Sequence, residues 1–213
     1  MYRALSITLL AIAFLAPPAA KAAFITTHET ELESLFAYNG LTLDVRYLPG
    51  TVLSDSSFLT LDSAAEFAAL LALTPAASSP TINLLFTDSL SWCGVPGAFI
   101  GCAELPGYRG VVESVFASTS TGDELVAHEI GHMFGLSHIA DVTRLMNPIL
   151  YGGIVLGATE IATILASPLI QNDGVDSIEI LPITVIPEPG TVALLAIGIG
   201  GLAARRRRIV ARQ

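Results

Sequence analysis

Apolar and polar residues alternate along several short stretches of the chain, and each stretch predicts a strand. Leu41 to Leu48 places apolar residues at every second position, which is the pattern of a half-buried strand. Thr81 to Thr87 is a short apolar run typical of an interior strand. Arg109 to Ser118 is also strand-like, and the acidic Glu113 within it indicates an edge strand with one side toward solvent.

Other stretches have helical spacing or the composition of a connection. Helices are predicted over Glu29 to Tyr38, over the Ala/Leu-rich stretch from Leu61 to Leu73, and over Thr159 to Gln171. Residues 89–107 are typical of a loop, and residues 172–186 of a polar, turn-rich linker. The order of these elements predicts an α/β or α+β fold, with one sheet packed against helices.

The first 22 residues have the three parts of a secretory signal peptide. Arg3 supplies a positive charge, Ala4 to Ala16 is an apolar stretch, and Ala20-Lys21-Ala22 offers small residues for cleavage. A membrane anchor is the alternative, but the apolar stretch is short for a spanning helix. The mature protein is therefore expected to begin near Ala23.

Residues 187–213 have a different three-part order. Pro187-Glu188-Pro189 precedes an apolar run from Thr191 to Ala204, and four arginines follow at 205–208. The basic end favours the cytoplasmic side of a membrane. This order resembles the PEP-CTERM sorting signal of Gram-negative bacteria, which implies a short transmembrane helix and processing by an exosortase during export. The alternative is a plain C-terminal anchor, and in both cases membrane contact is confined to this segment.

The body of the chain between these ends is strongly acidic. Hydrophobic residues make up 52% of the chain, and many of them lie at its two ends. Residues 23–186 contain only three basic side chains (Arg46, Arg109 and Arg144) against 18 acidic ones, a net charge of −15. Such a body would repel nucleic acid and anionic membrane surfaces. Nothing in the pattern indicates an oligomeric state.

The chain has two cysteines, Cys93 and Cys102. Exported proteins meet an oxidising environment, in which two cysteines this close in sequence are expected to form a disulfide. On the chain-entropy model, closing so small a loop stabilises the fold by about 2–3 kcal/mol.

Residues 128–138 read His-Glu-Ile-Gly-His-Met-Phe-Gly-Leu-Ser-His and contain three of the four histidines in the chain. Thr121 to Glu124 has the pattern of a capping box, which predicts a helix that begins near residue 122. His128 and His132 are four residues apart and would lie on one face of this helix. Gly135 can adopt the left-handed conformation that ends a helix, so the third histidine can return to the first two.

Three neutral imidazoles, from His128, His132 and His138, would leave the fourth tetrahedral position of a zinc ion open for water, as in catalytic sites. Glu129 lies beside them without being a ligand. As general base it would take the proton of the attacking water and pass it to the leaving amine. A structural zinc site normally uses a fourth protein ligand. The motif therefore predicts one catalytic Zn²⁺.

The eleven-residue motif is similar to that of the metzincin zinc peptidases, such as matrixins and reprolysins, and the resemblance extends over about residues 82–171. It implies a catalytic domain over residues 23–171 with one twisted, mostly parallel sheet and an antiparallel edge strand. It also implies an active-site helix, and a C-terminal helix after a Met-turn. Met146, eight residues after His138, is the Met-turn candidate. No tyrosine lies two residues after it, so the tyrosine ligand of astacins and serralysins is absent.

The resemblance also implies roles for further residues. The edge strand around Val111 and Val112 would pair with an extended substrate through main-chain hydrogen bonds. Tyr151 would either line the pocket for the side chain after the scissile bond or be a surface aromatic. Asn172 to Asp176 weakly resembles a structural calcium loop, but it lacks the further carboxylates and is more typical of a turn.

Together these features favour a secreted zinc metalloendopeptidase that cleaves protein or peptide substrates. A protein of another class fits part of the pattern: a non-catalytic zinc-binding surface or matrix protein that uses a metzincin-like domain for interaction. The presence of Glu129 and of all three histidines favours the enzyme.

Overall fold

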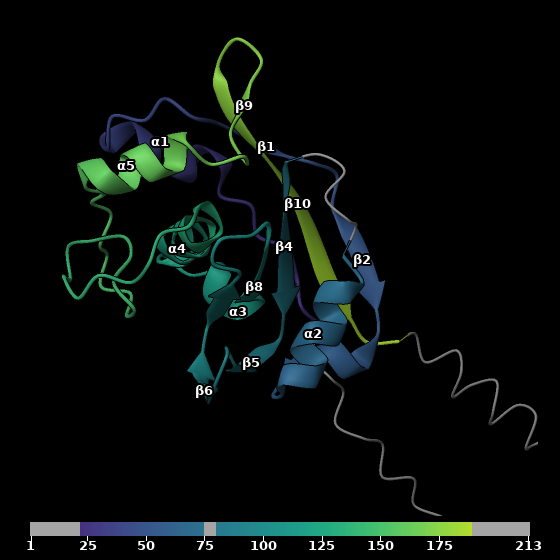
Figure 1. Ribbon diagram of the computed structural model, residues 1–213. Coiled ribbons are helices and arrows are strands. Elements are labelled where there is room, and N and C mark those ends of the chain that lie inside the picture. The colour runs from purple at the N-terminus through teal and green to yellow at the C-terminus, as the bar shows by residue number, and fades with distance from the viewer. Residues whose placement is uncertain (1–21, 75–79, 189–213) are drawn as a thin grey trace, which may run out of the picture.

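The computed structural model describes residues 22–74 and 80–188, whose helices and strands are arranged around one main sheet (Figure 1). Within these ranges, no helix has both the length and the apolar character needed to cross a membrane. The predicted signal peptide, except its last residue, and the apolar run of the predicted sorting signal lie outside the described residues. In chain order the elements are α1 (Glu29–Tyr38), β1 (Asp44–Tyr47), β2 (Thr51–Ser54), η1 (Ser56–Phe58), β3 (Thr60–Leu61), α2 (Ala64–Ala72), β4 (Thr81–Thr87), β5 (Ser89–Trp92), β6 (Pro96–Phe99), β7 (Gly101–Ala103), β8 (Arg109–Glu113), α3 (Ser114–Ala117), α4 (Gly122–Phe134), α5 (Ala158–Leu165), β9 (Gln171–Asn172) and β10 (Asp176–Ile186).

The main sheet has seven strands and is mostly parallel. Its order is β1-β10-β4-β8-β7, and β2 and β9 also pair with β10. Strands β1, β2 and β4 run parallel to β10, and β8 runs parallel to β4, whereas β7 runs antiparallel to β8 at the edge. The prediction of a mostly parallel sheet with an antiparallel edge strand is confirmed. A second sheet of three short strands, β3-β5-β6, is an addition that the sequence pattern does not predict.

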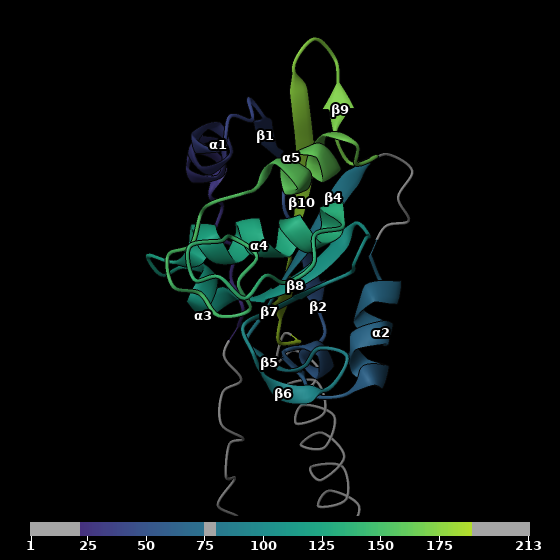
Figure 2. The same cartoon turned by 60° about the vertical axis from the view of Figure 1, so that its left-hand side comes forward.

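Both faces of the main sheet are covered. In β4, Ile82, Leu84 and Phe86 belong to one hydrophobic cluster and Leu85 to another, because successive side chains of a strand point to opposite faces. The first cluster includes residues of α1, α4 and α5, and the second includes residues of η1, α2 and the small sheet. Figures 1 and 2 show α1, α4 and α5 grouped on one side of the sheet, away from α2. Burial on both faces explains the continuous apolar run of β4.

The prediction of a linker over residues 172–186 is wrong, because this segment contains the central strand of the sheet. Strand β10 spans 11 residues and pairs with β4 on one side and with β1 and β2 on the other. The turn residues that suggested a linker join β9 to β10. Proline is unusual in a central strand. Pro182 lies between the residues of β10 that pair with β1 and those that pair with β2. The folded domain therefore extends to Ile186, beyond the predicted boundary at residue 171.

The prediction that β8 is an edge strand is also wrong. Strand β8 lies between β4 and β7, and its residues Val111 and Val112 are fully buried. Glu113 accepts a hydrogen bond from the backbone N–H of Leu90 at 2.6 Å. The predicted loop over residues 89–107 forms β5, β6 and β7, which are too short and too rich in Ser, Gly and Pro for periodicity to indicate them. Among the described residues, β7 is the free edge beside β8.

Candidate metal centre

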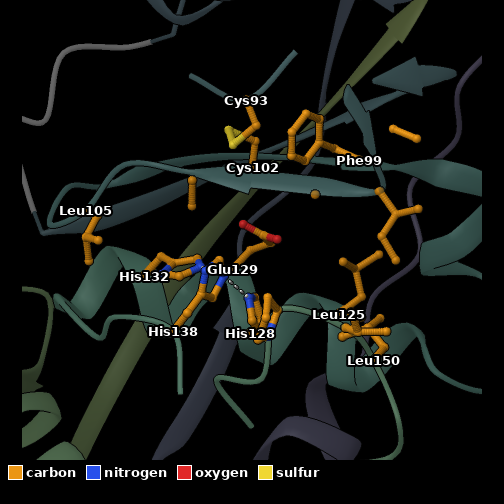
Figure 3. Close-up of a pocket in the computed structure, with 16 residues that line it drawn as sticks. Cys93, Phe99, Cys102, Leu105, Leu125, His128, Glu129, His132, His138 and Leu150 are labelled. Carbon is orange, nitrogen blue, oxygen red and sulfur yellow. Dashed lines mark hydrogen bonds between the residues drawn. A yellow bond between two sulfur atoms is a disulfide. The ribbon is translucent and has the colours of Figure 1, made fainter. Parts of the chain in front are cut away.

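Helix α4 carries the first two histidines of the motif against the sheet. It begins at Gly122, as predicted, is buried along nearly its whole length, and contacts β7 and β8. His128 and His132 lie one turn apart on it. The helix ends at Gly135, whose φ of 104° is left-handed. This residue turns the chain back, so that His138 reaches the other two histidines (Figure 3).

The ring nitrogens of the three histidines converge on one point. Nε2 of His138 lies 3.2 Å from Nε2 of His128 and 3.1 Å from Nε2 of His132. Nδ1–H of His128 donates to the carbonyl oxygen of Leu145, and Nδ1–H of His132 to that of Leu136, each at 2.8 Å. With Nδ1 as the donor, the Nε2 atoms of these two rings present their lone pairs to the shared point.

This arrangement fits a zinc ion. Tetrahedral ligands at about 2.0–2.1 Å from zinc lie roughly 3.3 Å from one another, close to the 3.1–3.2 Å between these nitrogens. Burial lowers the pKa of His128 to about 4 and also lowers the pKa of His132 and of His138. All three rings are therefore neutral at pH 7, as metal ligation requires. Facing lone pairs repel each other, and a cation between them removes that repulsion.

Glu129 lies beside the histidines, with its carboxylate between α4 and β7 (Figure 3). The side chain is 4% exposed, and burial raises its pKa to about 8. Its Oε2 atom has no hydrogen-bond partner among the described residues. The carboxylate lies so close to Gly101 of β7 that a Cβ there would overlap it. A buried carboxyl oxygen without a partner is costly to the fold, so its presence points to a functional role.

Met146, the Met-turn candidate, is fully buried against α4. Its sulfur lies against Gly131 of α4, and a Cβ at that glycine would be only 2.5 Å from it. The carbonyl oxygen of Met146 accepts a hydrogen bond from the backbone N–H of Ile139 at 2.8 Å. These contacts hold the residues around Met146 against α4 and beside Ile139, which follows His138. The thioether contributes packing there and no chemistry.

A cavity of about 570 Å³ opens beside the histidines and Glu129. Strand β7, helix α4 and the segment after Met146 contribute its walls. Tyr151 is 62% exposed and is not among the lining residues, which agrees with the alternative of a surface aromatic. The apolar side chains that line the cavity include Phe99, Ile100, Leu125, Pro148, Ile149 and Leu150.

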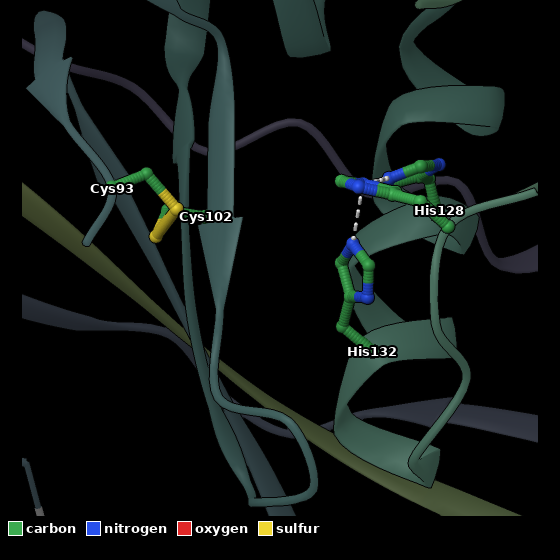
Figure 4. Close-up of a disulfide and its surroundings, with 5 residues drawn as sticks. Cys93, Cys102, His128 and His132 are labelled. Atoms are coloured by element: carbon green, nitrogen blue, oxygen red, sulfur yellow. Dashed lines mark hydrogen bonds between the residues drawn. A yellow bond between two sulfur atoms is a disulfide. The ribbon is translucent and has the colours of Figure 1, made fainter. Parts of the chain in front are cut away.

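The predicted disulfide between Cys93 and Cys102 is present, with an S–S distance of 2.07 Å. Cys93 follows β5 and Cys102 lies in β7, so the bond joins the small sheet to the edge of the main sheet. Both cysteines line the cavity. In Figure 4 the ribbon of the strand that carries Cys102 lies between the bond and the rings of His128 and His132. Spacing and export predict the bond but not its place beside the metal centre.

Among the described residues, the carboxylates around the turn over Asn172 to Asp176 do not gather with the spacing of a metal site. Arg46 lies among the nearby carboxylates and pairs with Asp44 at 2.7 Å and with Asp173 at 2.9 Å. A cationic side chain therefore already neutralises them. Within residues 22–74 and 80–188, the histidine cluster is the only group of three or more potential ligands with metal-binding spacing.

Comparison with known proteins agrees with this geometry. A family model described as metallo-peptidase family M12B, reprolysin-like, matches residues 23–139, which is more than half of the chain and includes Glu129 and all three histidines. A model of the PEP-CTERM protein-sorting motif matches residues 185–208, so the predicted sorting signal is confirmed. That motif indicates export to the cell envelope of a Gram-negative bacterium. None of the curated proteins compared with the chain matches it. The chain belongs to the reprolysin-like M12B metallopeptidase family.

Proposed function

We propose that this protein is an exported zinc endopeptidase that hydrolyses peptide bonds in protein or peptide substrates. The observation that carries the proposal is the convergence of three neutral histidine nitrogens beside a buried glutamate, at a cavity bounded by an edge strand. Membership of a metallopeptidase family supports peptide substrates. The sorting motif supports export and makes an exosortase-type enzyme the processing partner of the tail.

In this proposal Glu129 is the general base. It accepts a proton from the attacking water and then donates it to the leaving amine. Burial raises its pKa to about 8, and a carboxyl group whose pKa is near neutral can both accept and donate a proton. When bound, a zinc ion supplies Lewis-acid chemistry toward water and the substrate carbonyl, and its charge lowers the pKa of Glu129 from this value.

Strand β7 would hold the substrate. Its three residues all line the cavity, and its outer edge is free among the described residues. An extended peptide can pair with such an edge through main-chain hydrogen bonds. Because Gly101 lies against Glu129, a peptide paired with β7 would place its backbone next to the general base. This role for β7 replaces the one expected of Val111 and Val112.

The test is the substitution Glu129→Gln. Glutamine has nearly the shape of glutamate and Glu129 is not a ligand, so zinc content and fold should be unchanged. It cannot accept the water's proton, so turnover should fall by a factor of about 10²–10⁴. The measurement is cleavage of a quenched-peptide library by both proteins at equal zinc content. Glu31→Gln, on the exposed face of α1, is the control for loss of a surface carboxylate.

Two outcomes would contradict the proposal. A Glu129→Gln protein that retains more than about a tenth of the wild-type rate would show that Glu129 is not the base. Failure of the zinc-loaded wild-type protein to cleave any peptide in the library would favour the non-catalytic zinc-binding alternative.

A further inference from the structure

Glu124 is a buried carboxylate of α4 that the proposed mechanism does not use. It lies one turn before His128 and is 3% exposed. The predicted capping box does not form, because the side chain of Thr121 makes no cap hydrogen bond. Glu124 instead accepts hydrogen bonds from a loop far along the chain, residues 151–153.

Three successive backbone N–H groups of this loop point at the carboxylate. Oε1 accepts from Tyr151 at 3.2 Å, from Gly152 at 3.1 Å and from Gly153 at 2.9 Å. Oε2 accepts a second bond from Gly152 at 2.9 Å. Such a concave arrangement of amides needs an unusual backbone, and Gly152 has a φ of +81°. The carboxylate and the loop conformation therefore depend on each other.

Within residues 22–74 and 80–188, no cationic side chain pairs with Glu124. The basic side chains of the described domain, Arg46, Arg109 and Arg144, each form an ion pair with other carboxylates. A buried charge is costly unless hydrogen bonds replace its hydration. Among the described residues, the backbone N–H groups of the loop provide these hydrogen bonds to Glu124. Hydrogen bonds to a charged carboxylate are stronger than those between neutral groups. The loop is thus strongly held at this end.

The held loop is one wall of the cavity. Pro148, Ile149 and Leu150 line the cavity and immediately precede the three amides. The segment is also held at its beginning, because the carbonyl oxygen of Leu145 accepts from Nδ1–H of His128. Both attachments come from α4, at positions one turn apart. The helix that places the metal ligands therefore also places the wall.

We propose that Glu124 is a positioning residue that sets the width of this cavity and thereby the selectivity for the substrate side chain that enters it. The inference rests on the proposed peptidase function. All four hydrogen bonds of Glu124 go to the loop and none to the histidines or Glu129. Releasing the loop should therefore alter recognition of a large apolar side chain more than the chemical step.

The experiment compares Glu124→Gln with Glu124→Asp in the full-length, zinc-loaded protein. Asp123→Asn is the control, since Asp123 is the adjacent carboxylate and makes no hydrogen bond to the loop among the described contacts. Substrates are two variants of one cleaved peptide, with Phe or Ala at the position where cleavage is most selective. Glutamine places an amide N–H against the N–H of Gly152, whereas aspartate restores the charge at a shorter reach.

For Glu124→Gln the expected result is a fall of about tenfold in the Phe-over-Ala ratio of kcat/KM, carried mainly by KM for the Phe peptide. Turnover of the Ala peptide should stay within about threefold of wild type. Glu124→Asp should give an intermediate ratio, and Asp123→Asn the wild-type ratio. Hydrogen exchange gives a readout independent of activity: the amides of residues 151–153 should be protected in wild type and exchange faster in Glu124→Gln.

The outcomes separate this inference from the proposed function. Equal loss on both peptides, or unchanged exchange at residues 151–153, would overturn the positioning role while leaving the peptidase intact. If Glu124→Gln does not fold, a wild-type ratio in Glu124→Asp with unprotected loop amides would overturn it as well. If wild type and Asp123→Asn cleave neither peptide, the proposed function fails, and the inference on selectivity fails with it.

Discussion

At the scale of single residues, the site depends on glycine at position 101, which has no Cβ. A Cβ added to Gly101 would overlap the carboxylate of Glu129, and β7 cannot move away freely because the disulfide at Cys102 and the pairing with β8 hold it. Gly101→Ala should therefore displace Glu129. We expect about 1–3 kcal/mol of destabilisation and at least about a hundredfold loss of turnover, with zinc retained.

The matched control for this prediction is the same substitution in a Glu129→Ala background. There the space beside β7 is open, so Gly101→Ala should cost little stability. Urea unfolding of the four proteins gives the coupling between the two positions. An equal cost in both backgrounds would show that the glutamate is not what the new methyl group meets.

The residues of the site differ in how far the sequence predicts them. His128, Glu129, His132 and His138 are close in sequence, so helix geometry and the turn at Gly135 bring them together. The partner of Glu124 lies in a distant loop, so the local pattern predicts a cap for it instead. The contact between Gly101 and Glu129 likewise requires a strand and a helix that meet only in the fold, and no local signal indicates it.

At the scale of elements, the disulfide joins the small sheet to the strand that borders the metal centre. Replacing Cys93 and Cys102 together by serine should lower the free energy of unfolding by about 2–3 kcal/mol. Because the histidines are carried on the other side of the cavity, KM should rise more than kcat falls. Urea unfolding and peptide kinetics measure the two effects, and the reduced wild-type protein should behave like the double variant. An unchanged KM would show that β7 needs no such support.

Prediction of the elements succeeds where periodicity lasts long enough. The bounds of α1 and β4 agree with the sequence pattern. Strands β5, β6 and β7 have three or four residues each, at or below the shortest run in which an alternating pattern can be recognised. Strand β10 is long, but its apolar run contains Pro182 and follows turn residues, so local chemistry favours a linker.

At the scale of the whole molecule, the last strand of the chain occupies the middle of the sheet. Strand β10 pairs with β4 on one side and with both β1 and β2 on the other. Strands β1 and β2 are more than a hundred residues earlier in the sequence. Such long-range parallel pairing is intrinsically slow to form, because the entropy of closing a long loop is lost before the contacts stabilise the chain. The sheet, and the helix that it supports, therefore need the segment that directly precedes the sorting motif.

Two truncations test this dependence. A chain that ends after Ile186 keeps β10 and loses most of the sorting motif, which matches residues 185–208. It should fold cooperatively and cleave peptides like the full-length protein, but accumulate in a different compartment. A chain that ends after Asn172 lacks β10, which leaves β4 without its partner on one side and uncovers apolar residues of both clusters. It should be unfolded and inactive.

The truncation after Asn172 is the decisive one. The shortened chain should stay folded if β10 is dispensable and should unfold if β10 is essential. Ile178 and Ile180 of β10 pack with α1 and α4 in one cluster, and Ile183 and Val185 pack with α2 in the other. Their loss removes four buried aliphatic side chains, and burial of each contributes about 1.5–3 kcal/mol. The sum is comparable to the net stability of a typical domain, about 5–15 kcal/mol. Loss of the cooperative urea transition and of bound zinc is therefore expected. A folded, active chain ending at Asn172 would show that β1, β2 and β4 can form a stable sheet without β10.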